Sequence, residues 1–81
     1  MRFSAQITDN DVLDAIRDLG YVATLPALLR LISARHGVSI DNEQTANMVR
    51  NQITRRLSIL VKYRFITRTG QKRSYKYRIE E

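Results

Sequence analysis

Apolar side chains recur every three or four residues in three stretches of the chain, separated by short polar or glycine-containing breaks. This spacing places the apolar side chains on one face of a helix. At the first stretch, Thr8 is a candidate N-cap, and Asp11 follows three residues later, as in a capping box. Gly20 supplies a C-terminal stop. The pattern predicts a first helix over 9–19.

The second stretch predicts a helix over 24–36. Thr24 is its candidate N-cap, and Pro26 is tolerated in the first turn, where an amide would have no partner within the helix. The stripe expected to be buried consists of Leu25, Leu28, Leu29 and Ile32. The residues expected to face solvent are Arg30, Ser33 and Arg35. His36 ends this helix, where a positive charge favours the negative end of the dipole.

The longest periodic stretch predicts a third helix over 43–63. Its apolar face consists of Ala46, Val49, Ile53, Leu57 and Leu60. At about 100° per residue, the opposite face carries amide and basic groups, namely Gln44, Asn47, Asn51, Arg55, Ser58 and Lys62. The flanks of these two faces hold Met48, Thr54, Arg50 and Arg56.

After the third helix the period changes from 3.6 to 2, which is typical of strands. Residues 65–69 and 74–79 form two alternating stretches, and the turn 70–73 joins them into a β-hairpin. Tyr75, Tyr77 and Ile79 share one face of the second strand, which we expect to be half-buried. Residues 21–23 suit a brief extended segment. The chain is therefore predicted to be one domain over 1–81, mainly α with a C-terminal β-hairpin (α+β), preceded by an N-terminal extension at 1–7.

Charge is distributed unevenly along the 81 residues. Ten Lys or Arg residues and no Asp or Glu lie between Gln44 and Ile79, whereas the first 43 residues hold four basic and six acidic residues. With Glu80 and Glu81 counted, the formal charge of +6 divides into about −2 on the first part and +8 on the second. A basic surface of this kind favours a polyanion as partner, and nucleic acid is the first candidate.

Several classes of function find no support in the composition. There is no cysteine, so disulfides and cysteine–zinc sites are excluded. No apolar run approaches the ~20 residues of a membrane span, and the N-terminus lacks the apolar core of a signal peptide. There is no nucleophile–base pair, metal-ligand spacing or glycine-rich phosphate loop. We therefore expect a cytoplasmic protein that is not an enzyme and has no cofactor, metal or small-molecule ligand.

The stretch 53–79, ITRRLSILVKYRFITRTGQKRSYKYRI, runs from the end of a long amphipathic helix through two short strands joined by a basic turn. Together with the two preceding helices, it resembles the winged helix-turn-helix transcription regulators of bacteria and archaea. The resemblance covers nearly the whole chain from Thr8. One position differs: the family usually has glycine just before the first wing strand, where this chain has Arg64. If the backbone is left-handed there, the side chain costs roughly 1 kcal/mol.

The resemblance implies sequence-specific binding to double-stranded DNA, with the third helix in the major groove, and hence a nucleoid-associated protein. The side chains that would reach base edges are Gln44, Asn47, Met48, Asn51 and Arg55. Those that would contact phosphate are Thr24, Arg50, Thr54 and Lys62. The wing on the backbone or minor groove would consist of Gln71, Lys72 and Arg73.

Two alternatives remain open from the sequence. A winged helix can serve as a protein–protein interaction module within a larger assembly, although such modules often lose the basic character kept here. Binding of RNA or single-stranded nucleic acid would need exposed aromatic rings for stacking, which Tyr75 and Tyr77 could supply only on an open face. A homodimer is also possible, since many regulators of this type bind paired half-sites.

Overall fold

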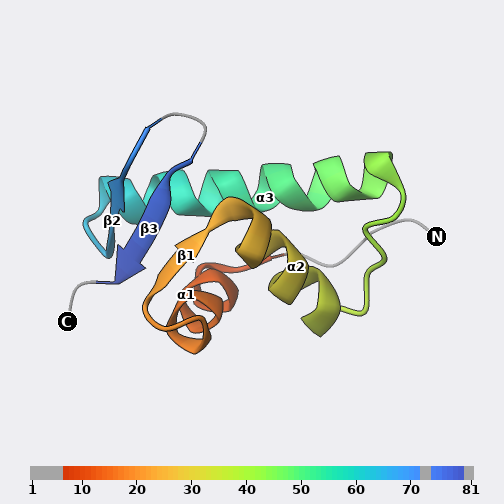
Figure 1. Cartoon of the computed structure of the whole chain (residues 1–81), viewed down its shortest axis with the longest axis horizontal. Coiled ribbons are helices and arrows are strands. Elements are labelled where there is room, and N and C mark those ends of the chain that lie inside the picture. The colour runs from red at the N-terminus through yellow and green to blue at the C-terminus, as the bar shows by residue number, and fades with distance from the viewer. Residues whose placement is uncertain (1–6, 72–73, 80–81) are drawn as a thin grey trace.

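The computed structural model describes residues 7–71 and 74–79. It contains three helices and three short strands (Figure 1). In chain order these are α1 (Asp9–Asp18), β1 (Val22–Thr24), α2 (Leu25–Arg35), α3 (Glu43–Lys62), β2 (Ile66–Thr69) and β3 (Lys76–Ile79). This is an α+β fold whose arrangement is compatible with that of a winged helix.

The predicted helices are all present, and each bound lies within one residue of its prediction. The hairpin strands are shorter than predicted, because Phe65, Ser74 and Tyr75 lie outside them. Phe65 instead follows a turn in which its backbone N–H donates to the carbonyl of Leu60 at 2.9 Å. The helix therefore ends through a turn of its own before the sheet begins.

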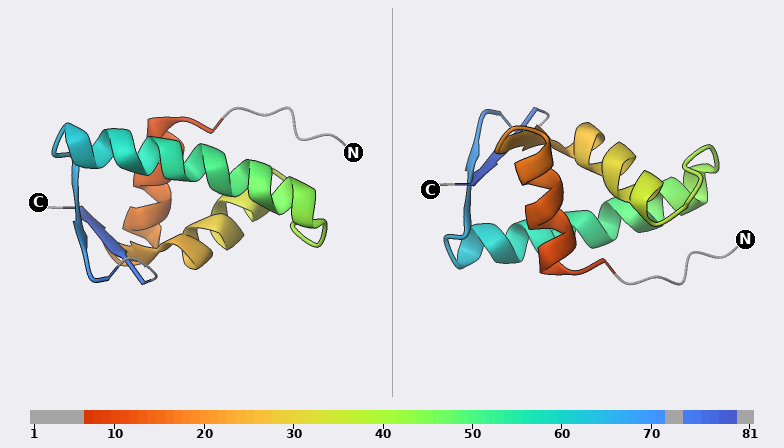
Figure 2. Two further views of the ribbon diagram at one scale, coloured as in Figure 1. Left: turned by 90° about the horizontal axis from the view of Figure 1, so that it is seen from above. Right: turned by 90° about the horizontal axis from the view of Figure 1, so that it is seen from below.

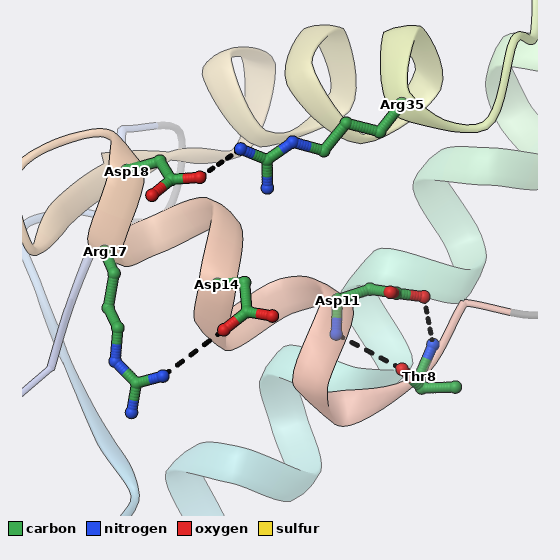
Figure 3. A network of polar contacts seen from close by, with 6 residues as sticks. All are labelled: Thr8, Asp11, Asp14, Arg17, Asp18 and Arg35. Carbon is green, nitrogen blue, oxygen red and sulfur yellow. Dashed lines mark hydrogen bonds and ion pairs between the residues drawn. The ribbon is translucent and has the colours of Figure 1, made fainter.

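The predicted capping box at the start of α1 is confirmed. The backbone N–H of Asp11 donates to the Thr8 hydroxyl at 3.2 Å, and the Thr8 backbone N–H donates to the Asp11 carboxylate at 3.0 Å (Figure 3). The second bond is the main reason why the pKa of Asp11 lies below its ordinary value, and His36 nearby lowers this pKa further. A carboxylate with a lowered folded-state pKa stabilises the fold at neutral pH.

Replacing Asp11 with asparagine is expected to lower the free energy of unfolding at pH 7 by about 0.3–1 kcal/mol, because the negative charge near the helix N-terminus is lost. Stability gained from a lowered pKa is present above the unfolded-state value and is lost as the pH falls through the folded-state value. The difference between wild type and variant should therefore shrink in acid. Urea unfolding between pH 7 and pH 2.5 measures it, and a difference that stayed constant over this range would contradict the explanation.

The sheet has the strand order β1-β3-β2, and both pairs are antiparallel. Tyr77 lies at its centre, opposite Ala23 on one side and Arg68 on the other. The extended segment predicted at 21–23 is thus a true strand at 22–24, and it pairs with the last strand of the chain. This pairing joins residues more than fifty positions apart, which the local sequence pattern did not predict.

The core lies where α1, α2 and α3 meet the inner face of the sheet. Figure 2 shows α1 crossing α3 near the sheet, with α2 beside the other half of α3. Helix α3 contributes the predicted side chains Val49, Ile53, Leu57 and Leu60, all buried, while Ala46 at its start is only partly buried. Tyr77 and Ile79 close the core from the sheet, and Tyr75 is partly buried, as expected.

One exposure prediction was wrong. Ser33, expected to face solvent, is only 2 % exposed. Helix α2 packs against both α1 and α3, so a wider arc of its surface is covered than the leucine stripe indicates. Ser33 lies one turn beyond Leu29 at the edge of that stripe, and its buried hydroxyl has no hydrogen-bond partner among the described residues.

The backbone at Arg64 is left-handed, with φ of 65°. Winged helix-turn-helix regulators usually have glycine at this position. Because the backbone is left-handed here, the strain expected for a residue with a Cβ atom is present at Arg64. A non-glycine residue in this region costs about 1–2 kcal/mol relative to its preferred conformations.

Replacing Arg64 with glycine is expected to raise the free energy of unfolding by about 0.5–1 kcal/mol, because relief of strain exceeds the extra freedom that glycine gives the unfolded chain. Chemical denaturation at neutral pH measures the change. Arg64→Ala is the matched control, since it removes the same charge and keeps the Cβ atom. Equal stabilisation by both variants would show that charge, and not backbone strain, is responsible.

Candidate nucleic-acid interface

Helix α3 starts at a defined residue because Asn42 caps it. The Asn42 side-chain oxygen accepts hydrogen bonds from the backbone N–H groups of Gln44 at 2.8 Å and Thr45 at 3.3 Å. These are two of the amides that have no partner within a helix. The cap therefore fixes the first turn of α3, from which Gln44 projects.

The five side chains predicted to reach base edges are all exposed on α3. At about 100° per residue, they fall within an arc of roughly 100° on the face opposite the buried stripe. From Gln44 to Arg55 this face extends over about 16 Å, the length of about five base pairs of duplex DNA. Among the described residues, the structure thus brings these five side chains together on a single exposed surface.

A hydrogen bond within this surface was not predicted. The guanidinium of Arg50 donates from Nη1 to Oδ1 of Asn47 at 3.0 Å, one helical turn back. It orients the Asn47 amide so that its NH₂ group remains available as a donor. Arg50 keeps further N–H groups for an anion, because a guanidinium carries five. A bond at this i, i+3 spacing could be expected from the sequence, since these neighbours face each other on a helix.

The acidic side chains of α1 pair with basic groups of α1, of α2 and its C-cap, and of α3; Figure 3 shows the pairs with Arg17 and Arg35. Asp14 lies 3.3 Å from Arg17, and Asp18 contacts Arg35 of α2. Asp11 lies 3.4 Å from His36 Nε2.

Asp9 reaches α3. Its Oδ1 atom lies 3.6 Å from Nη1 of Arg56, too far for a hydrogen bond but close enough for electrostatic attraction. Arg56 is partly buried at the border of the core stripe, where the sequence placed it. This ion pair links the start of α1 to the middle of α3. Arg56 is therefore less available to an anionic binding partner than the other basic residues of α3.

The other basic residues described on α3 and the hairpin make no ion pair with a described carboxylate. They are exposed, and they comprise Arg50, Arg55, Lys62, Arg64, Arg68, Lys76 and Arg78. The acidic side chains of α1 are therefore paired, whereas most of the basic side chains described on α3 and the hairpin are not paired with a carboxylate. An anionic partner would meet cations that need not first be released from a described carboxylate.

Strands β2 and β3 lie beside the C-terminal half of α3 (Figure 1). Gln71 in its turn is exposed. Lys72 and Arg73, predicted to form the wing tip with it, lie outside the described residues. Thr24 occupies the N-cap position of α2, but its side chain makes no capping hydrogen bond, so it is not a plain side-chain cap.

Aromatic rings of the hairpin are not freely available for stacking. Tyr77 is 7 % exposed, and Tyr75 is partly buried with the Arg68 guanidinium 4.4 Å from its ring centroid. The open aromatic face that single-strand binding would need on this strand is therefore not present.

Within residues 7–71 and 74–79, no three His, Cys, Asp or Glu side chains come together in a way that could hold a metal ion. None of the helices there has the length and apolar character to cross a membrane. Comparison with protein-family models, curated proteins and solved structures finds no match to this chain.

Proposed function

We propose that this chain is a winged helix-turn-helix domain that binds duplex DNA in a sequence-specific way and acts as a small transcription regulator at the nucleoid. The observation that carries the proposal is the set of seven exposed cations on α3 and the hairpin that make no ion pair with a described carboxylate, whereas the acids of α1 are already paired. Phosphate contacts from such cations provide most of the affinity of proteins for DNA.

Helix α3 suits the major groove in size and chemistry. A helix about 10–12 Å wide fits a groove about 12 Å wide. Gln44, Asn47 and Asn51 carry amides, which can pair with adenine, while Arg55 can pair with guanine and Met48 can contact a thymine methyl. Arg50, Thr54 and Lys62 lie on or beside this face and would hold phosphates that fix the register of the helix.

Asn51→Ala is the test of base reading. A DNA-selection experiment on the wild type defines a preferred site, and anisotropy titrations on single-base variants of that site give the discrimination at each position. The substitution is expected to lose about 1–3 kcal/mol of discrimination at one position and little elsewhere.

Ser58→Ala is the matched control, because Ser58 is exposed on the same side of α3 and has no assigned contact. It should leave the preference profile unchanged. If Asn51→Ala weakened binding to every sequence equally, α3 would contact DNA without reading it.

A second candidate, a protein-interaction module, is favoured by a separate observation. Tyr63 and Phe65 are 64 % and 60 % exposed, more than any other large hydrophobic residue described. Neither belongs to the face assigned to DNA.

A further inference from the structure

One of the side chains assigned to base reading is held by another side chain. The Oδ1 atom of Asn47 accepts a hydrogen bond from Nη1 of Arg50 at 3.0 Å, about one helical turn further along α3. The side chains of Gln44 and Asn51 make no hydrogen bond with another described residue. The orientation of the Asn47 amide is therefore fixed before a partner binds, whereas the other two amides of this face are free to rotate.

The hydrogen bond allows only one orientation of the Asn47 amide. A guanidinium carries N–H donors and no acceptor, so the amide meets Arg50 through its oxygen. Hydrogen bonds from a charged donor are stronger than those between neutral groups, which holds the amide against a rotation of 180°. The group that Asn47 offers to a partner is therefore its NH₂, a donor.

The surroundings leave this pair intact and accessible. Both side chains are exposed, and Glu43, the one carboxylate of α3, lies two turns from Arg50 and makes no ion pair with it. The described chain reaches α3 on another flank, where the backbone N–H of Ile7 donates to Oε1 of Gln52 at 3.0 Å. At about 100° per residue, Gln52 lies about 140–160° around the helix from Asn47 and Arg50.

The four bases fall into two classes by one group on the major-groove edge. Guanine and thymine carry a keto oxygen, whereas adenine and cytosine carry an amino group. The NH₂ group of Asn47 can donate to a keto oxygen. An amino group would need the Asn47 oxygen as its acceptor, but that oxygen is already bonded to Arg50, and the amino hydrogens would approach a positive guanidinium. The pair therefore favours keto bases.

We propose that Asn47 reads a keto base, guanine or thymine, and that Arg50 is the positioning residue that restricts it to this class. The inference rests on the proposed function, because it assigns the base preference of one side chain on the face of α3 that would enter the major groove. Of the five N–H groups of Arg50, one holds Asn47 and the others remain for a phosphate. Gln44 and Asn51 have no such partner and keep adenine as an option.

The test uses the site that DNA selection defines for the wild type. Anisotropy titrations of Asn47→Ala on single-base variants of this site identify the position at which discrimination is lost. There, the wild type should bind guanine or thymine at least about fivefold more tightly than adenine or cytosine, which corresponds to one hydrogen bond. Arg50→Met removes every donor of the side chain, and the preference should fall to about twofold or less.

Two comparisons separate positioning from phosphate binding, because Arg50→Met also weakens binding to every sequence. Lys62→Met removes another cation of α3, one that hydrogen-bonds none of the described base-reading side chains, so it should weaken binding and leave the preference unchanged. In the Asn47→Ala background, Arg50→Met should no longer alter the preference at that position, because the side chain that it positions is gone.

The hydrogen bond itself is tested without DNA. Nuclear magnetic relaxation of the side-chain NH₂ groups in the free protein reports their mobility on the ps–ns timescale. Arg50→Met should lower the order parameter of the Asn47 NH₂ group. The NH₂ group of Asn51, which no described side chain holds, is the control and should not change. Circular dichroism confirms that each variant is folded.

Four outcomes would overturn this inference and leave the proposed function standing. They are a preference for adenine or cytosine at the position that Asn47 reads, uniform weakening by Asn47→Ala, an unchanged keto preference in Arg50→Met, and an unchanged Asn47 order parameter in that variant. Binding of the wild type without any sequence preference would instead overturn the proposed function, and this inference with it.

Discussion

Replacing Ile53 with alanine is expected to reduce the free energy of unfolding by about 2–5 kcal/mol. Ile53 has no exposed surface and lies midway along α3, among Val49, Leu57 and the helices that pack on them. The substitution removes buried methyl groups and leaves a cavity that rigid neighbours fill only in part. For a chain of this size the total stability is roughly 4–12 kcal/mol, so the variant should be largely unfolded at modest urea concentrations.

The matched control is Ile59→Ala on the same helix. Ile59 is 38 % exposed, so the same change of side chain should cost well under 1 kcal/mol. Urea unfolding followed by circular dichroism compares the two. Similar losses in both variants would mean that the buried and exposed faces of α3 are not those described.

The second large effect concerns affinity for DNA. Arg50→Gln/Lys62→Gln removes two exposed cations assigned to phosphate, and it is expected to weaken binding roughly 10–100-fold at low salt. The plot of log K against log salt should become shallower by about 1.8, since each neutralised phosphate contributes about 0.9. Anisotropy titrations of a labelled duplex between 50 and 300 mM salt give both quantities.

Arg17→Gln/Arg35→Gln changes the net charge by the same amount and is the control. These two arginines are held by Asp14 and Asp18 on the acidic part of the surface. Surface ion pairs contribute little to stability, so the fold should be retained. If this control lowered affinity and salt dependence as much as Arg50→Gln/Lys62→Gln, binding would follow net charge, and the unpaired cations of α3 would have no special role.

Features that depend on residues three or four positions apart were predictable. The capping box of Thr8 and Asp11 and the buried stripe of α3 follow from one helical turn, which has nearly the same geometry in every protein. For the same reason, the exposure of Gln44, Asn51 and Arg55 on one face was predicted correctly. Their role in binding DNA stays a prediction.

Features that depend on distant residues were not predictable in this way. The pairing of β1 with β3, the burial of Ser33 and the ion pair of Asp9 with Arg56 all depend on how the helices and strands pack together. No alternation or spacing along the chain contains that information, because each partner lies many residues away. The hydrogen bond of Arg50 to Asn47 is local, but its effect on the surface depends on which face of α3 is left open.

The sequence by itself determined the helical periods, the hairpin and the division of the chain into an acidic part and a basic part, since these depend on neighbouring residues and on composition. Only the tertiary structure decided which charges are paired. It paired the acids of α1 with nearby bases, Arg56 of α3 among them, and left the other basic side chains described on α3 and the hairpin exposed. It also brought Tyr21 and Phe65 to the same end of the sheet, because backbone pairing with β3 joins two segments that are far apart in the chain.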